Sequence, residues 1–150
     1  LRRRFPFELW LIIAAALTLS QALYNSGVVT LLTDALHANL AGLGPYAALA
    51  GIYLFTLVLT EVMTNNAAAA LSFPMAFGLA ESYGISHMPF IMAVAYGASA
   101  SFLTPYGYTT NLMVQNLGGY QMRDYVRAGL PLSITYSVIV ILLVPRVFPF

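Results

Sequence analysis

The sequence has 150 residues, of which 60% are hydrophobic and only 7% are charged, against roughly 25% charged in a typical soluble domain. Six arginines and no lysine stand against five acids, so the chain has neither a basic stripe for nucleic acid nor an acidic tail. The absence of cysteine from the sequence excludes disulfides, thiolate metal sites and cysteine nucleophiles. We therefore expect an all-α integral membrane protein that contacts the lipid bilayer and no nucleic acid.

The first long uncharged run extends from Leu9 to Thr33 and holds 25 residues, which is long enough for one membrane span. Arg2 to Arg4 precede it, but the run exceeds the roughly 7 to 15 apolar residues of a signal peptide. Residues 34–44 read as a loop or a surface helix. The chain opens on Leu1 rather than on methionine, and we expect it to be a fragment of a longer protein.

The second run covers residues 45–80 and contains a single charge, Glu61. One straight helix of that length would measure about 54 Å, against about 30 Å for the bilayer core. We therefore predict a helical hairpin whose tip is the polar stretch at residues 64–66. Its second arm, residues 67–80, would hold only about 21 Å of helix, so we predict that the hairpin is re-entrant.

The third run, residues 86–119, is again too long for one span, and Pro105 and Gly107 interrupt it. Proline disfavours helix at the residue before it, and glycine adds backbone freedom. We predict a discontinuous helix over about 88–117, with half-helices at about 88–101 and 110–117 joined by unwound backbone. An interfacial segment at about 120–128 and a last span at about 130–148 complete a single transmembrane domain, 1–150.

The arginines set the orientation, because those near span ends prefer the cytoplasm. With Arg2 to Arg4 inside, one span leads out, the hairpin returns outside, and the broken helix brings Arg123 and Arg127 back to the cytoplasm. A single crossing by residues 45–80 would place those two arginines outside. The rule therefore favours a hairpin. Two full spans would return the chain to the same side, so the rule does not distinguish them from a re-entrant hairpin. We expect a multi-pass protein of the cell membrane, in a bacterial inner membrane.

Two stretches of non-helical backbone at membrane depth, 64–66 and 104–111, need a reason, because such backbone is tolerated only inside protein or around a wet cavity. Their free carbonyls suit a hard cation such as sodium, and the helix N-termini near Asn66 and Thr110 suit an anion. Transporters with discontinuous helices combine these features. The alternative is a noncatalytic membrane packing module whose polar breaks only contact partner chains. We expect no enzyme, because no nucleophile–base pair or metal spacing is present.

Glu61 is the only acid deep inside an apolar run, and acids within the membrane are functional candidates. Two roles are open from the sequence. The side chain could relay protons, or it could brace the hairpin tip through hydrogen bonds.

The hairpin tip resembles a motif of the divalent anion:sodium symporters, a family that includes sodium/sulfate and sodium/dicarboxylate carriers. That family has Ser-Asn-Thr at each of two hairpin tips, and residues 60–67, Thr-Glu-Val-Met-Thr-Asn-Asn-Ala, resemble the second copy. Thr64 takes the serine position, Asn65 matches, and Asn66 replaces the threonine. The Thr-Asn-Asn-Ala version is closer to sulfate-type or uncharacterised permeases than to dicarboxylate carriers.

A second element of the resemblance lies downstream, where Phe102-x-x-Pro105 with Asn111 resembles the unwound segment of the family. That segment usually ends Thr-Pro-Pro-Asn, whereas this chain has Tyr-Thr-Thr-Asn at 108–111. The resemblance extends over residues 9–148 and implies that the chain is the C-terminal inverted repeat of a carrier.

The resemblance implies sodium-coupled symport of a small divalent anion, sulfate-type or dicarboxylate, by alternating access. It also implies a missing N-terminal repeat of the same carrier and a homodimer, so that this repeat alone should not transport. Sodium is the implied coupling ion, and its implied site is framed by Thr60, Met63, Asn65, Gly107 and Thr109. The residues implied to face the anion are Thr64, Asn65, Asn66, Thr110 and Asn111.

Overall fold

The computed structural model describes residues 44–150, except the side chain of Thr109, and before them only residues 7, 10, 11, 14, 15, 18, 21, 22, 25–28, 30, 31, 34, 35 and 38. The prediction of an all-α fold is confirmed, because every regular element among these residues is helical. About half of the predicted span 9–33 and most of the segment 34–44 fall outside the described residues. Within 9–33 the described residues are helical apart from a turn at Ser26 and Gly27.

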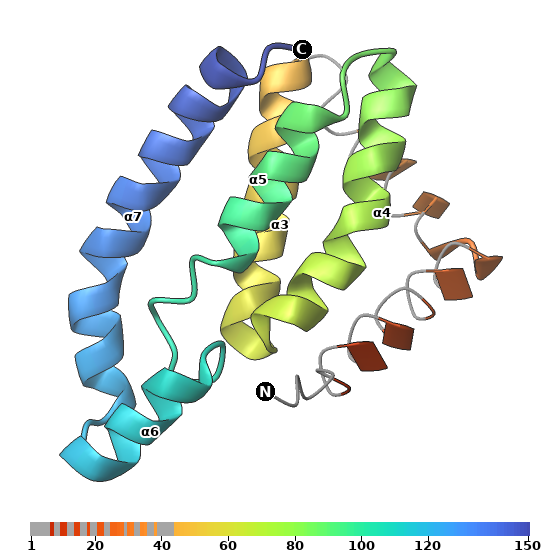
Figure 1. Ribbon diagram of the computed structural model, residues 1–150. Helices are drawn as coiled ribbons and strands as arrows, with labels where there is room; N and C mark the ends of the chain where they lie inside the picture. Colours follow the sequence, from red (N-terminus) through yellow and green to blue (C-terminus); the bar gives the residue numbers. More distant parts are fainter. Residues whose placement is uncertain are drawn as a thin grey trace, which may run out of the picture.

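Helices α3 (Gly44–Val62) and α4 (Asn65–Tyr83) form a hairpin that turns at Met63 and Thr64 (Figure 1). Thr64 has an extended backbone (φ −67°, ψ 149°), and its hydroxyl accepts a hydrogen bond from the backbone N–H of Ala67 at 3.4 Å. Thr64 is thus the N-cap of α4.

The second arm of the hairpin is longer than the sequence indicated. Helix α4 has 19 residues, about 28 Å, because it continues past Glu81 and ends only at Gly84. Gly84 has φ 63°, and its N–H donates to the carbonyls of Ala80 and Glu81. Glu81 is exposed and therefore does not end the helix, which is why a boundary drawn at the first charge was wrong.

Helix α5 (Met88–Ala98) and helix α6 (Thr109–Gly118) are separated by ten residues of unwound chain. Pro89 lies in the first turn of α5, where a missing N–H has no cost. Helix α5 ends three residues before the predicted residue 101, because the backbone N–H groups of Phe102 and Leu103 bind a side chain instead of helical carbonyls. Gly119 ends α6 with φ 67°.

Helix α7 (Met122–Val147) is one continuous helix of 26 residues. It runs without a break through the predicted interfacial segment at 120–128 and the predicted span at 130–148, and the position of each relative to the membrane stays a prediction. Gln121 and Asp124 form a capping box that starts the helix at Met122, and the chain stays helical through Pro131. Proline removes one backbone hydrogen bond, and membrane helices tolerate it.

The core lies where α3, α4 and α5 pack together, and α7 packs against α3 and α5 (Figure 1). Gly97 of α5 allows a close approach to α3, because an added Cβ would lie 3.0 Å from the carbonyl oxygen of Tyr53. The Tyr53 hydroxyl in turn lies 3.0 Å from the Ser137 hydroxyl of α7. The largest fully buried apolar side chains are Tyr53, Phe90, Leu49, Ile52, Met75 and Leu79.

The hairpin tip lies short of the end of the molecule at which α7 begins (Figure 1). The rings of Tyr46 and Phe150 are 4.9 Å apart, so α3 begins where α7 ends. From the contact between Tyr53 and Ser137, α3 continues for about 14 Å to its tip, whereas α7 extends about 22 Å to its first residue. Among the described residues, α3 and α7 are the two helices long and apolar enough to cross a membrane. The depth of the tip in a bilayer stays a prediction.

Candidate ion and substrate site

The side chain of Asn65 lies among oxygen atoms from three separate parts of the chain. With the amide nitrogen turned towards them, that nitrogen lies within hydrogen-bond distance of the carbonyls of Gly107 (3.0 Å) and Ala98 (3.1 Å) and of the hydroxyl of Thr60 (2.9 Å), and it shares its two hydrogens among these three oxygen atoms. The amide oxygen accepts from the hydroxyl of Tyr108 (3.0 Å). One side chain therefore ties the hairpin tip to the end of α5 and to the unwound segment. We call the oxygen atoms of Thr60, Ala98 and Gly107 around this amide the Asn65 cluster.

The opposite orientation of the amide would place its oxygen against the same three oxygen atoms. The Thr60 hydroxyl has a single proton, and it donates that proton to the Ala98 carbonyl at 2.7 Å. Without a cation, the orientation with nitrogen inward is therefore favoured, since it pairs every polar atom. A hard cation favours the orientation with oxygen inward, because amide, carbonyl and hydroxyl oxygens are its ligands.

Any cation in the Asn65 cluster would be held by neutral oxygen atoms. In the part of the chain that the structure describes, no group of three His, Asp or Glu side chains is placed to hold a metal ion. Carbonyls of unwound backbone are the usual ligands of sodium in transporters with broken helices. The carbonyl, hydroxyl and amide oxygens of the Asn65 cluster are of the kind that sodium takes.

Helices α4 and α6 begin next to each other. Tyr108 is the N-cap of α6, and its hydroxyl binds Asn65, the first residue of α4. Tyr108 makes no side-chain cap bond to α6, and the cap bond of Thr64 on α4 is long, at 3.4 Å. Because the N-terminus of a helix carries partial positive charge and free N–H groups, two such ends together form a favourable environment for an anion.

Glu61 directs its carboxylate at the unwound segment. Its Oε1 accepts the backbone N–H groups of Phe102 and Leu103, both at 3.0 Å, and its Oε2 lies 3.5 Å from the hydroxyl of Ser101. The backbone carbonyl of Glu61 accepts the hydroxyl of Thr104 at 2.7 Å. Glu61 is only 9% exposed, so these bonds replace the water that a buried carboxylate has lost.

Three of the five residues predicted to frame a sodium site lie together in the structure. Thr60, Asn65 and Gly107 meet within hydrogen-bond distance, and a Cβ on Gly107 would collide with Ser101 and lie 2.7 Å from the Thr60 carbonyl. Met63 is half-buried in the hairpin turn. The structure describes only the backbone of Thr109, at the start of α6. That any of them binds sodium stays a prediction.

Most residues predicted to face the anion lie at the two helix N-termini. Thr64, Asn66 and Thr110 are exposed there. Asn111 is half-buried, and its backbone carbonyl accepts the hydroxyl of Tyr125 at 2.9 Å. Asn111 also lines the pocket beside α7, whereas the side chain of Asn65 is directed at the cluster.

Sequence reasoning missed Ala98 and Tyr108, which both contact Asn65. Ala98 acts through its backbone carbonyl, which no residue type reveals. Tyr108 carried a signal, because a hydroxyl at the residue before a predicted helix is available for bonding. It was interpreted only as a departure from the family motif.

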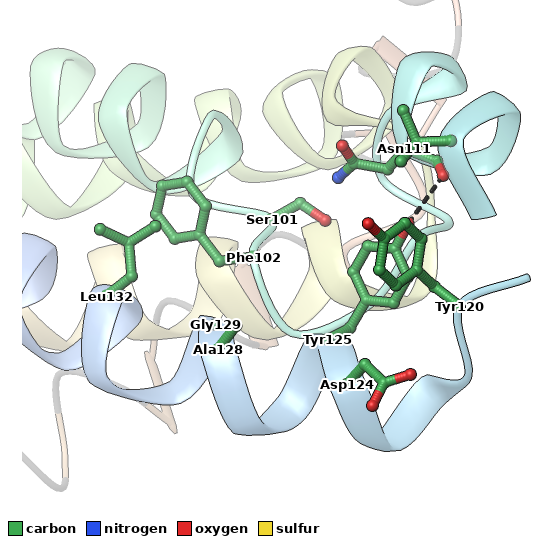
Figure 2. Close-up of a pocket in the computed structure, with 10 residues that line it drawn as sticks. Ser101, Phe102, Asn111, Tyr120, Asp124, Tyr125, Ala128, Gly129 and Leu132 are labelled. Carbon is green, nitrogen blue, oxygen red and sulfur yellow. Dashed lines mark hydrogen bonds between the residues drawn. The ribbon is translucent and has the colours of Figure 1, made fainter. Parts of the chain in front are cut away.

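A pocket of about 400 Å³ lies on the α7 side of the unwound segment (Figure 2). Asp124 is the single charged residue in its lining, and that lining includes no basic side chain. An acidic, mainly apolar pocket does not suit an anion. Its lining includes Asn111 from the first turn of α6 and no residue of α4. Its lining consists of Ser101, Phe102, Asn111, Val114, Tyr120, Asp124, Tyr125, Ala128, Gly129 and Leu132.

Comparison with known proteins gives consistent matches over almost the whole chain. Residues 1–148 match the family described as the sodium:sulfate symporter transmembrane region. The chain is 37% identical over 137 residues to an uncharacterized transporter of Synechocystis, and the match covers 91% of the chain and 22% of that protein. It is 35% identical over 139 residues to sodium/sulfate cotransporter 1 of Chlamydomonas reinhardtii, and this match covers 92% of the chain and 16% of that protein. The uncharacterized transporter YfbS of Escherichia coli is 32% identical over 140 residues, covering 93% and 23%. The chain thus spans less than a quarter of the length of these relatives.

Proposed function

This chain belongs to the sodium:sulfate symporter family of membrane proteins, and from that premise we propose that it forms the ion and substrate site of a sodium-coupled anion carrier. The carrier would transport a small divalent anion, of the sulfate type or a dicarboxylate. The observation that carries the proposal is the position of Asn65, between a cluster of neutral oxygen atoms and two adjoining helix N-termini.

Sodium acts first in the proposed cycle. It enters the Asn65 cluster, and the amide of Asn65 turns its oxygen towards the ion, because the cation takes oxygen ligands. That turn brings the amide nitrogen to the Tyr108 hydroxyl, so the hydrogen bond between them reverses and the hydroxyl becomes the acceptor. Sodium binding therefore changes the contact between the first residue of α4 and the N-cap of α6.

The anion follows at the two N-termini, where Thr64, Asn66 and Thr110 are exposed. Their hydroxyl and amide groups can donate to an anion, and the positive ends of α4 and α6 add electrostatic attraction. A sodium ion beneath the site lowers the cost of bringing negative charge into the membrane. Coupling follows from this proximity, because each ion stabilises the other.

Transport also requires parts of the carrier beyond this chain. We propose that this repeat pairs with an N-terminal repeat of the same carrier, that the carrier is a homodimer, and that the site is exposed to each side of the membrane in turn. The greater length of the relatives supports a further repeat.

Uptake by the carrier that contains this chain tests the proposal. Proteoliposomes receive radiolabelled sulfate or succinate under an inward gradient of sodium chloride or of choline chloride. We expect one of the anions to accumulate only with sodium. Equal uptake with choline, or none of either anion by well-folded protein, would contradict the proposal and favour a membrane packing module.

A further inference from the structure

The unwound segment between α5 and α6 contacts Glu61 through four consecutive residues. Two of them, Phe102 and Leu103, present backbone N–H groups that have left helical pairing, and a single carboxylate oxygen accepts both. Unpaired backbone groups are costly at membrane depth. Glu61 therefore substitutes for the carbonyls that a continuous helix would have supplied.

The opposite side of the same segment is also fixed. Gly129 of α7 lies so close to the Phe102 carbonyl that a Cβ at this glycine would collide with it. The ring of Phe102 makes an edge-to-face contact with Tyr136 at 5.5 Å between ring centroids. The segment is thus held between the carboxylate of α3 and the backbone of α7, which leaves its peptide planes little freedom.

The held segment lies between two carbonyls of the Asn65 cluster. Ala98 precedes it and Gly107 follows it, and both contact Asn65. We propose that Glu61 is a positioning residue, whose carboxylate fixes residues 101–104 so that these two carbonyls stay at the spacing that a cation requires. The proposal rests on the function proposed above and assigns Glu61 no contact with either transported ion.

This role differs from proton relay in a way that substitutions can reveal. Every bond of the Glu61 side chain uses it as an acceptor. Glutamine keeps a carbonyl oxygen that can accept from Phe102 and Leu103, whereas alanine leaves both N–H groups unpaired. A positioning role therefore predicts partial rescue by Glu61→Gln. A proton relay predicts that Gln is as defective as Ala, because neither side chain can bind and release a proton in the physiological pH range.

The first test measures amide hydrogen exchange of the segment 99–108 in the full-length carrier in lipid nanodiscs. We expect Glu61→Ala to accelerate exchange of the Phe102 and Leu103 amides by roughly tenfold or more, the factor that corresponds to a lost charge-assisted bond. Glu61→Gln should have a smaller effect. Glu81→Ala, which removes an exposed acid of α4, is the matched control and should have none. Unchanged exchange in Glu61→Ala would overturn the proposal.

The second test measures the sodium concentration for half-maximal anion uptake, at several pH values. We expect this concentration to rise by about tenfold in Glu61→Ala and by less in Glu61→Gln, with the pH profile unchanged. Faster exchange with an unaltered sodium requirement would overturn the positioning role, and loss of pH dependence in Glu61→Gln would favour proton relay. If the wild-type carrier shows no sodium-dependent uptake, the proposed function is refuted instead. Amide hydrogen exchange would then test only whether Glu61 fixes residues 101–104.

Discussion

At the residue scale, the site depends on where single protons lie. The Thr60 hydroxyl can donate only once, and it donates to Ala98, so the Asn65 amide must supply the remaining hydrogen bonds when no cation is present. The hydrogen bonds around the Asn65 amide are therefore all formed without an ion, and in the proposed cycle a bound cation turns this amide. The polar residues involved carry no charge, so in the proposed cycle the coupling comes from the attraction between the two bound ions.

The space beside Gly107 leads to a prediction about packing. A Cβ at this position would collide with the side chain of Ser101, and overpacking of this kind costs about 1–3 kcal/mol. We expect Gly107→Ala to lower the midpoint of thermal unfolding in detergent and to weaken sodium-dependent uptake.

Ser101→Gly provides the compensating change for this prediction. In the double variant Ser101→Gly/Gly107→Ala the colliding side chain is gone, while the contact with the Thr60 carbonyl at 2.7 Å remains. We expect partial recovery of stability. If Gly107→Ala alone keeps the wild-type midpoint of thermal unfolding and the wild-type sodium-dependent uptake, the close packing at Gly107 is wrong.

The sequence predicted some of these residues and could not predict others. Asn65 was identified because a polar stretch inside an apolar run is visible in the sequence, whereas Thr60 was implied only by the family resemblance. The Ala98 carbonyl was not, because every residue has a carbonyl and only the three-dimensional path selects one. For Glu61 the sequence left two roles open, and its backbone partners at Phe102 and Leu103 became known only from the structure.

At the element scale, the breaks between helices were easier to predict than their ends. The length of an apolar run against the bilayer thickness requires a turn near Thr64 and an interruption near Pro105. Helix ends depend on local bonds instead. Gly84 extends α4 past a charge, and the capping box at Gln121 makes α7 continuous, so boundaries drawn from charge and proline were displaced.

The start of α7 can be tested directly. The Asp124 carboxylate accepts the backbone N–H of Gln121 at 2.9 Å and lies at the positive end of the helix. We expect Asp124→Ala to destabilise the protein by about 1 kcal/mol, in the range of lost helix caps. The measurement is thermal unfolding in detergent.

Glu81→Ala is the control for helix polarity. Glu81 lies near the C-terminus of α4, where a negative charge is unfavourable, so its removal should leave stability unchanged or slightly higher. A destabilisation by Glu81→Ala equal to that by Asp124→Ala would show that loss of an acid, rather than loss of a cap, causes the effect.

At the scale of the whole molecule, α3 and α5 run side by side in the same direction, from the end at which α7 finishes towards the hairpin tip and the unwound segment (Figure 1). The tip of α3 and α4 meets the unwound segment beside α7, short of the end where α7 begins (Figure 1). A site built there lies inside the protein and away from both of its ends. The arginine distribution predicts that Arg123 and Arg127 lie in the cytoplasm.

This orientation predicts which loops can be labelled from outside. Single cysteines are introduced as Ser86→Cys, between α4 and α5, and as Asn116→Cys, in α6, in a carrier otherwise free of cysteine. We expect a membrane-impermeant maleimide to modify Ser86→Cys on intact cells and Asn116→Cys only after permeabilisation. The reverse pattern would contradict the orientation, and modification of both on intact cells would contradict the passage of the broken helix between them.

Radioactive sodium influx, driven by an inward gradient of the transported anion, tests most directly the claim that the Asn65 cluster binds the coupling ion. We expect the wild-type carrier to take up sodium with the anion, and Asn65→Ala to lose this influx by about tenfold or more, because it removes the one side chain that contacts all three oxygen atoms. Asn116→Ala, at an exposed position of α6, should retain it. Wild-type sodium influx in correctly inserted Asn65→Ala would contradict the account.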